Sequence, residues 1–395
     1  MEVKTLILGA GAAGMMCAAR AGAGTLVVDH ARAPGEKIRI SGGGRCNFTN
    51  LATAPERFLS RNPHFAKSAL SRYSQWDFLD LVRSHGISWH EKTLGQLFCD
   101  GKATQIVAML RDAMARAGAE LRLRTRPVEV GHDGTGFRVV LERDGTRQTV
   151  TARHLVLATG GLSIPKMGAT GLAYRLARQF GHDLVATRPA LVPLTFSGAS
   201  LEPLAALAGV AAPARVTCGG TGFDEAVLFT HRGLSGPAIL QISSYWQEGD
   251  TIALDFDPDA RLAGALGAAR AAEGRKAPAT VLAQHLPARL VAARLPRGLP
   301  PRLAECSDGT LTELLRNYHA WNIRPAGTEG YRTAEVTAGG IDTAGLSSRT
   351  MESRSQPGLF VVGEALDVTG WLGGYNFQWA WSSGWAAGEE IRSRP

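Results

Sequence analysis

Short apolar runs at the start of the chain alternate with a glycine turn and an Ala-rich segment. Residues 5–8 predict a buried strand, residues 9–14 a glycine-rich turn, and residues 15–23 a helix. A second apolar run, residues 26–28, ends at Asp29. This order of strand, turn, helix and strand is typical of a dinucleotide-binding unit, so we expect an α/β fold with a Rossmann-type domain.

The glycines of this turn have a specific use. They allow the backbone to approach a pyrophosphate, whose charge the free N–H groups at the start of the following helix then hold. An acidic residue after the second strand accepts hydrogen bonds from ribose hydroxyls. The candidate cofactor contacts here are Gly9, Gly11, Ala12, Ala13, Gly14, Asp29 and His30.

A second glycine-rich stretch covers residues 41–50. Three consecutive glycines bring no side chain to a core and are costly to order, so they indicate a loop whose backbone touches a ligand. A flexible surface turn is the alternative interpretation. The candidate contacts in and before this stretch are Lys37, Ser41, Gly42, Gly43, Gly44, Arg45, Cys46 and Asn47.

Further strands that run into glycines occur in the middle and at the C-terminal end of the chain. The apolar strands at residues 155–158 and 358–362 each run into glycines, and residues 373–375 precede a helix predicted over 376–388. The positive end of that helix stabilises the anion of a reduced flavin, so both ends of the chain together predict one FAD site. Its further candidates are Thr159, Gly160, Gly161, Gly363, Glu364, Gly373, Gly374, Tyr375, Asn376 and Phe377.

The pattern changes twice between these segments. Prolines and short strand-like runs begin near residue 190, and an Ala-, Leu- and Arg-rich helical pattern covers about 262–318. We therefore expect a discontinuous FAD-binding domain, residues 1–190 and 326–395, with an inserted β-rich domain at 191–255 and a helical subdomain at 256–325.

Composition narrows the class of protein. The 395 residues are 45% hydrophobic, yet no apolar run approaches the roughly 18 residues of a membrane span, and the chain begins directly with a strand, which favours a cytoplasmic location. The five cysteines form no CxxC pair, so we expect neither a redox dithiol nor a bound metal. The formal charge of +8 fits a polyanionic partner, although basic enzymes without one are common.

One further segment, residues 228–237, places a His beside an Arg in a glycine-rich turn. His231 could donate a proton and Arg232 could bind an anion or a carbonyl oxygen. A structural His that caps the turn is the alternative.

These stretches carry a resemblance. The chain resembles the BaiN/YhiN-like flavoproteins, also called aminoacetone-oxidase-like, and within them the YhiN subgroup. The similarity rests on residues 9–14, 41–50, 75–78, 95–100, 228–237, 328–337 and 370–378. It implies bound FAD and a flavoprotein fold of the two-dinucleotide-binding-domain type with an inserted β-rich domain. Branches of the family are associated with amine oxidation or steroid and bile-acid reduction, and the YhiN branch resembles ribosomal RNA dihydrouridine synthases.

The resemblance implies reduction of a uridine C5=C6 bond in large-subunit (23S) rRNA, with NADH or NADPH as the reductant. Hydride delivered to C6 leaves an enolate that needs hydrogen-bond donors and an acid to protonate C5. Our candidate catalytic residues are His231, Cys46 and Arg232, with Arg45 as a further donor and Cys99 as a further acid. The alternatives are oxidoreduction of a small amine or enone, and a non-enzymatic FAD-containing RNA-binding or assembly factor.

Overall fold

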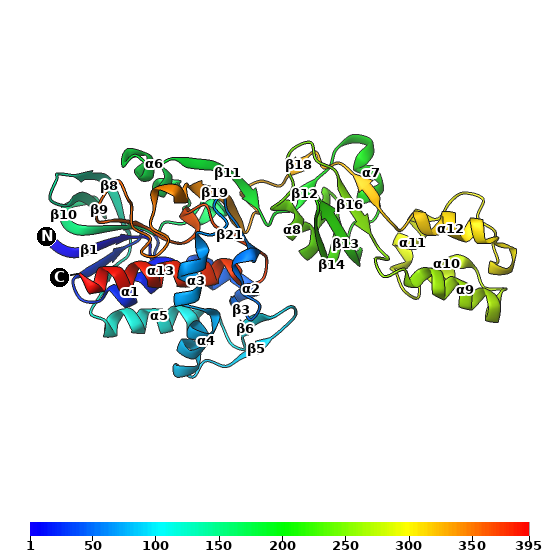
Figure 1. Ribbon diagram of the computed structural model, residues 1–395, viewed down its shortest axis with the longest axis horizontal. Coiled ribbons are helices and arrows are strands. Elements are labelled where there is room, and N and C mark those ends of the chain that lie inside the picture. The colour runs from blue at the N-terminus through cyan, green and yellow to red at the C-terminus, as the bar shows by residue number, and fades with distance from the viewer. Residues whose placement is uncertain (395) are drawn as a thin grey trace. The chain divides into compact units, whose positions relative to one another are not determined.

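The computed structural model describes residues 1–394 (Figure 1). Its contacts divide the chain into two compact units. The first, the outer unit, joins Met1–Arg188 to the segment that begins at Val336, and the second, the inserted unit, is Pro189–Glu335. The chain thus leaves the outer unit once and returns to it. No described helix combines the length and apolar character that crossing a membrane requires.

The main sheet of the outer unit has its most buried strands at its centre. β1 (Glu2–Leu8) pairs in parallel with β2 (Thr25–Val28) and β10 (Thr146–Leu157), and β10 also pairs in parallel with β20 (Leu359–Val361). Strands covered on both faces read as continuous apolar runs, which explains the runs at residues 5–8 and 26–28. The remaining strands are β7 (Glu120–Arg122), β8 (Thr125–His132) and β9 (Phe137–Arg143), in the order β7-β2-β1-β10-β9-β8.

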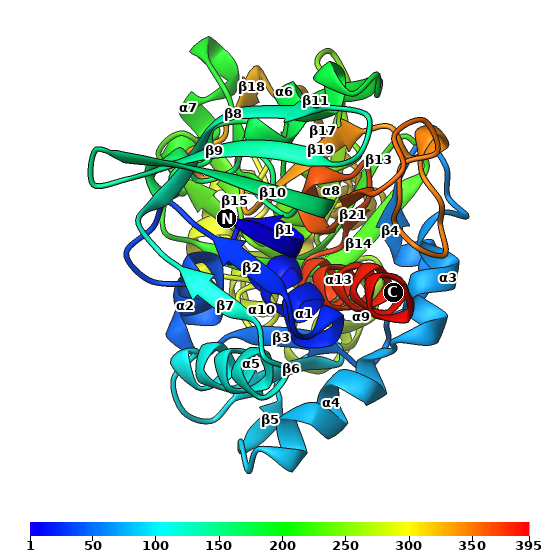
Figure 2. The ribbon, with the colours of Figure 1, turned by 90° about the vertical axis from the view of Figure 1, so that its left-hand side faces the viewer.

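Two helices from opposite ends of the chain pack against each other beside this sheet. α1 (Ala12–Ala21) and α13 (Tyr375–Ser393) lie side by side (Figure 2). A Cβ at Gly384 would lie 2.4 Å from the carbonyl oxygen of Ala13, and one at Gly388 would lie 2.6 Å from that of Cys17. Glycines one turn apart therefore allow the backbones to touch, which brings the C-terminal segment to the N-terminal turn.

The outer unit also contains shorter elements. Its other helices are α2 (Glu36–Gly44), α3 (Ala66–Arg72), α4 (Gln75–Ser84), α5 (Thr104–Arg116) and α6 (Leu172–Gln179). Three small sheets pair β3 (Asn47–Asn50) with β6 (Gln96–Cys99) and β5 (Trp89–Glu91), β4 (Phe58–Leu59) with β21 (Thr369–Gly370), and β11 (Leu184–Ala190) with β19 (Val336–Ile341). Residues 47–50, which the sequence indicated as loop, form a strand because β6 supplies a partner from about 50 residues further along.

The inserted unit combines a sheet with short helices. The sheet order is β17 (Trp321–Ile323), β16 (Ile252–Asp255), β13 (Ala211–Cys218), β14 (Thr221–Thr230), β15 (Gly233–Ser235), β12 (Leu194–Thr195) and β18 (Gly327–Thr328). The helices are α7 (Glu202–Ala205), α8 (Pro237–Ser243), α9 (Arg261–Glu273), α10 (Pro278–Leu282), α11 (Ala288–Arg294) and α12 (Asp308–Arg316). Since β17 and β18 complete the sheet, the chain leaves this unit after residue 335, ten residues beyond the boundary that the sequence suggested.

Candidate cofactor site

The turn between β1 and α1 is shaped by three glycines with different tasks. Gly9 has φ +111°, and a Cβ there would lie 2.4 Å from the carbonyl oxygen of Ala158, while a Cβ at Gly14 would lie 2.0 Å from that of Gly9. These two glycines are required by packing. A Cβ at Gly11, in contrast, would meet no atom within 4 Å. Gly11 therefore leaves open space at the start of α1, where a helix N-terminus receives a pyrophosphate, and the turn fits a dinucleotide.

Asp29 closes this turn from the end of β2. Its two carboxylate oxygens accept hydrogen bonds from Ala10 N (2.7 Å) and Ala31 N (2.8 Å), and its side chain is 15% exposed. The Nδ1 of His30 lies 3.3 Å from Asp29 Oδ1, and the His30 side chain is largely exposed. Because each carboxylate oxygen can accept a second hydrogen bond, Asp29 can fix the turn and still bind a ribose hydroxyl.

A polar network joins the N-terminal and C-terminal parts of the outer unit. The ammonium of Lys37 contacts Glu364 Oε2 and Ser163 Oγ, both at 2.6 Å, and Ser163 Oγ donates to Glu364 Oε1 at 2.9 Å. Thr337 N also donates to Glu364 Oε1 (3.0 Å), and Thr337 Oγ1 accepts from Leu162 N (2.8 Å). Sequence reasoning found Lys37 and Glu364 but missed Ser163 and Thr337, although each lies within two residues of a glycine pair, 160–161 or 339–340.

The residues of the glycine run 42–44 bend α2 away from helical geometry. Ser41 has ψ 148°, and Gly42 and Gly43 have φ 56° and 66°. A Cβ at Gly42 would lie 2.7 Å from the ring of Phe98, whereas a Cβ at Gly43 would meet nothing within 4 Å. Gly42 is therefore needed for packing against β6, whereas Gly43 leaves its backbone open. Arg45 is exposed on the same loop.

Cys46 lies beneath this loop. Its side chain is wholly buried, its φ is 51°, and its N–H donates to the carbonyl of Ser41 at 3.0 Å. Burial raises the pKa of the thiol to about 12. Cys99, also buried, has a pKa raised to about 11 by the same cause. Both thiols lack exposed surface and hold their protons more tightly than a free cysteine does, which disfavours them as acids toward a substrate.

The loop before α13 is held by β3. Asn50 Nδ2 donates to the carbonyl of Gly373 (2.9 Å), and a Cβ at Gly374 would lie 2.4 Å from the carbonyl oxygen of Thr49. Asn376 uses its amide to accept from Gly370 N and to donate to Gly370 O, both at 2.8 Å. The first turn of α13 is therefore fixed by side-chain hydrogen bonds and close contacts with both β3 and β21.

Several C-terminal candidates are engaged by the protein itself. Tyr375 is buried and its hydroxyl accepts a hydrogen bond from Arg57, while the ring of Phe377 stacks on Trp381 with centroids 5.6 Å apart. Gly363 N donates to Ser383 Oγ (3.0 Å), and Gly363 O accepts from Trp379 Nε1 (3.1 Å). The side chains of Tyr375, Asn376 and Phe377 are therefore engaged within the protein and position this loop.

Of the two glycines after β10, one is required by packing and one faces open space, as in the turn after β1. A Cβ at Gly161 would lie 2.5 Å from Thr337 Oγ1, while Gly160, with φ +71°, faces nothing within 4 Å. Thr159 and Gly160 are half-buried at the end of the strand. Among the glycines that we expect to contact the cofactor, the open positions are thus Gly11, Gly43 and Gly160.

His231 and Arg232 belong to the inserted unit, unlike the other candidates. Both are exposed in the turn between β14 and β15. Arg232 N donates to Thr230 Oγ1 (3.2 Å), and Arg232 O accepts from Phe196 N (3.0 Å). The backbone of this turn is therefore held while both side chains remain available to a ligand.

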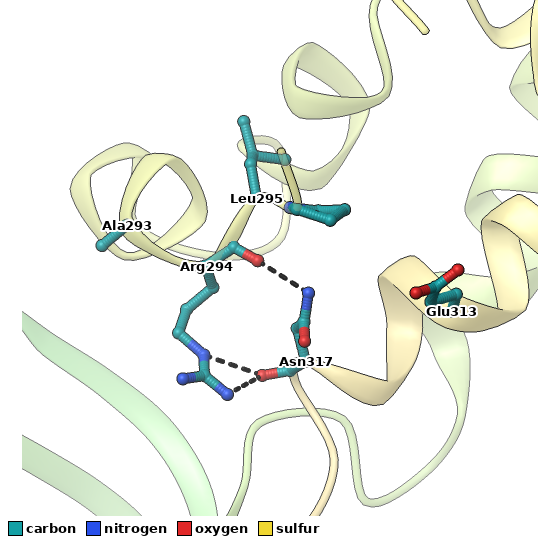
Figure 3. Close-up of a pocket in the computed structure, with 6 residues that line it drawn as sticks. Ala293, Arg294, Leu295, Glu313 and Asn317 are labelled. Carbon is teal, nitrogen blue, oxygen red and sulfur yellow. Dashed lines mark hydrogen bonds between the residues drawn. The ribbon is translucent and has the colours of Figure 1, made fainter. Parts of the chain in front are cut away.

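The inserted unit has a polar cavity of about 320 Å³ between α11 and α12 (Figure 3). Arg294 donates from Nε and Nη2 to the carbonyl of Asn317 (2.9 and 2.7 Å), and Asn317 Nδ2 donates to the carbonyl of Arg294 (3.0 Å). Arg294 also lies over the Trp321 ring at 4.1 Å. These polar groups already satisfy one another, so the cavity offers no evident chemistry.

Charge is divided unequally between the two units. The outer unit carries 30 Lys and Arg and 21 Asp and Glu, a formal charge of +9, while the inserted unit carries 13 and 14, a charge of −1. The positive charge of the chain therefore lies on the unit that holds the glycine-rich turns.

Known proteins are similar to this chain over nearly its whole length. The chain is 52% identical over 392 residues to a protein of Escherichia coli (strain K12) named "Ribosomal RNA dihydrouridine synthase", covering 98% of this chain and 97% of the relative. It is 30% identical over 426 residues to the "3-dehydro-bile acid delta(4,6)-reductase" of Clostridium scindens, covering 98% of this chain and 99% of the relative.

The fold is also similar to that of a solved structure. A 3-ketosteroid-delta4-(5alpha)-dehydrogenase from Rhodococcus jostii RHA1 superposes with a TM-score of 0.53 at 17% identity, covering 100% of this chain and 97% of that one. The expected Rossmann-type FAD-binding fold is thereby confirmed. The model of one family, described as "HI0933-like protein Rossmann domain", matches residues 3–390, and the chain belongs to that family.

Proposed function

We propose that this protein is an FAD-dependent reductase that converts a uridine of large-subunit ribosomal RNA to dihydrouridine in the cytoplasm. The observation that carries the proposal is 52% identity along nearly the full length of a protein named for this reaction. The glycine-rich turns supply a place for FAD, and the positive charge of the outer unit suits an RNA backbone.

The cofactor would be held by residues that the protein does not need for its own packing. Gly11, Gly43 and Gly160 leave open space beside exposed backbone, and the Lys37–Glu364 pair ties together the two segments around them. Bound and reduced, FAD supplies a hydride equivalent for C6 of a uracil ring. The protein must then stabilise negative charge on O4 and provide a proton for C5.

We assign the proton to His231 and the stabilisation of O4 to Arg232. Both side chains are exposed on a turn whose backbone is fixed, and an imidazole can hold a transferable proton near neutral pH. Arg45 is the corresponding exposed cation on the glycine loop of the outer unit. Cys46 is less suited to be the acid, because its thiol is buried and burial raises its pKa to about 12.

We further propose NADH or NADPH as the source of electrons. Only one glycine signature of the dinucleotide type follows a strand in this chain, so a separate nicotinamide domain has no evident place. The nicotinamide and the RNA would then visit the cofactor in turn. Double-reciprocal plots of initial rate against nicotinamide concentration, at several fixed RNA concentrations, should give parallel lines. Intersecting lines would contradict alternating binding of the two substrates.

The deciding experiment uses large-subunit rRNA that lacks the modification. It is incubated with the purified protein, FAD and NADH or NADPH, and mass spectrometry searches for a uridine that has gained two hydrogens. We expect a gain at one defined position. No gain, with the flavin still reduced by the nicotinamide, would reject RNA as the substrate.

A second candidate is reduction of a small enone. The 30% identity to the "3-dehydro-bile acid delta(4,6)-reductase" over 98% of this chain favours it. The two candidates differ in salt dependence, since binding to RNA weakens steeply with ionic strength and binding to a neutral enone does not. Nicotinamide oxidation that requires an enone and ignores RNA would establish the second candidate.

A further inference from the structure

An arginine of the outer unit is fixed between two aromatic rings without a carboxylate partner. The guanidinium carbon of Arg57 lies 5.2 Å from the ring centroid of Trp371 and 5.7 Å from that of Tyr375, and Arg57 also donates to the Tyr375 hydroxyl. No ion pair among residues 1–394 includes Arg57. The side chain is half-buried, so its charge is held in one place by two aromatic rings rather than by a carboxylate.

The backbone around Arg57 is fixed as well. Its carbonyl accepts a hydrogen bond from Trp371 N at 3.1 Å, and the next two residues form β4, which pairs with β21. Figure 2 shows β4, β21 and α3 beside α13. Trp371 and Tyr375, whose rings meet at 68° with centroids 6.4 Å apart, belong to the loop and first turn of α13. Arg57 therefore occupies a rigid position next to the C-terminal part of the candidate cofactor site.

Arg57 begins a segment with cations only. Residues 57–72 contain Arg57, Arg61, Lys67 and Arg72 and neither Asp nor Glu. Arg61 is paired with Asp342 (2.8 Å), and Arg72 donates to the carbonyl of Arg349 (2.6 Å) and lies over the Trp385 ring. Lys67 is exposed on α3 and enters no ion pair in the described chain. Two cations of this segment, Arg57 and Lys67, therefore lack an anion.

We propose that this segment is a phosphate-binding surface for RNA. Arg57 binds the phosphate of a nucleotide beside the target uridine, and Lys67 binds a further phosphate. The inference rests on the proposed function and names the surface that receives its substrate. Arginine is suited to the first role because its planar fork binds phosphate oxygens in pairs, and Lys67 acts as a mobile point charge. The +9 charge of the outer unit favours the same partner.

The test measures RNA binding separately from reduction. Binding of a large-subunit rRNA transcript to the FAD-loaded protein is titrated at several salt concentrations for the wild type, Arg57→Met, Arg57→Lys and Arg57→Met with Lys67→Met. Each lost phosphate contact should lower the slope of log affinity against log salt by about 1, so the single and double variants should lose about 1 and 2. Arg57→Lys should keep the slope and bind more weakly, because it retains the charge without the fork.

Arg138→Met is the matched control. Arg138 is an exposed cation of β9 in the same unit, and its loss removes the same charge from a different surface. It should leave the slope unchanged. Flavin absorbance of each variant, measured in parallel, should match the wild type, and the thermal midpoint should fall only slightly in the Arg57→Met variants, which lose the contacts with Trp371 and Tyr375.

Three outcomes would overturn the inference. If the wild type and Arg57→Met show the same slope of log affinity against log salt, Arg57 does not contact a phosphate. Release of flavin from Arg57→Met would make Arg57 a cofactor ligand, and unchanged binding with slower reduction would place it on the uracil ring. Failure of the proposed function would give a different result. The wild type and variants would then bind the transcript with the expected salt slopes, but the wild type would reduce no uridine in it.

Discussion

The ammonium of Lys37 lies 2.6 Å from Glu364 Oε2, although 327 residues separate the two in the sequence. The pair is partly buried, with side chains 35% and 17% exposed, and Ser163 and Thr337 add hydrogen bonds to it. Both halves of the outer unit therefore meet in one network beside the open glycines. Because removal of one partner leaves the other charge uncompensated, the loss of FAD affinity on changing both residues should be smaller than the sum of the two single losses.

We expect Lys37→Met and Glu364→Gln each to lower FAD affinity at least about tenfold, and the double variant to lose less than the two single losses combined. Flavin released on dialysis, measured by fluorescence, provides the comparison. Arg126→Met serves as the control, since it breaks an ion pair with Glu142 on an exposed surface of the same unit and should cost at most about 1 kcal/mol of stability. Additive losses for Lys37 and Glu364 would show that the two do not act as a pair.

Gly11 and Gly14 provide a matched pair of substitutions in one turn. Gly11→Ala adds a methyl group where no protein atom lies within 4 Å, so the cofactor-free protein should lose no more than about 1 kcal/mol while FAD binding weakens strongly. Gly14→Ala adds it 2.0 Å from the carbonyl oxygen of Gly9 and should destabilise the fold by at least about 1–3 kcal/mol.

Thermal unfolding without FAD and flavin titration separate these two effects. Normal FAD affinity in Gly11→Ala would show that the open space at the start of α1 does not receive the cofactor.

His231 and Cys46 should respond differently to substitution. His231→Gln should lower the rate of uridine reduction by about 100-fold or more while leaving reduction of the flavin by nicotinamide unchanged, because it removes a proton donor and no cofactor contact. Cys46→Ala removes a buried sulfur and should lower stability by about 1 kcal/mol with little effect on the rate. Single-turnover kinetics of each half-reaction distinguishes the two. A large rate loss in Cys46→Ala without destabilisation would restore the thiol as the acid.

His154 should make stability depend on pH. It is buried, its Nδ1 has no hydrogen-bond partner, and burial lowers its pKa to about 4 from an ordinary 6.5. The folded state therefore favours the neutral ring, and its contribution is complete above pH 6.5 and lost as the pH falls from 6.5 to 4. A pKa difference of this size corresponds to about 3 kcal/mol.

Denaturant unfolding at pH 7.0 and 4.5 tests this expectation. His154→Gln, which cannot be protonated, should lose less stability between the two pH values than the wild type, whereas His64→Gln, on the surface, should follow the wild type. The same loss in all three proteins would assign the pH dependence to other groups.

Local patterns in the sequence were sufficient for the elements around the cofactor turn. The apolar run, the glycines and the Ala-rich segment at residues 5–23 correspond to β1 and α1 (Ala12–Ala21), because hydrogen bonding and packing there involve neighbouring residues. The helix predicted over 376–388 is α13 (Tyr375–Ser393), which extends further at its C-terminal end. The change to prolines and short strand-like runs near residue 190 also lies close to the point where the chain leaves the outer unit.

Contacts between distant segments were decided only by the tertiary structure. Residues 47–50 become a strand because β6 pairs with them, Cys46 is buried because the bent glycine loop covers it, and Ser163 and Thr337 join Lys37 and Glu364 because α13 draws the C-terminal segment against α1. Sequence periodicity reports which face of an element is apolar. It does not report which distant element covers that face, and burial, ion pairing and the availability of a side chain for chemistry all depend on that partner.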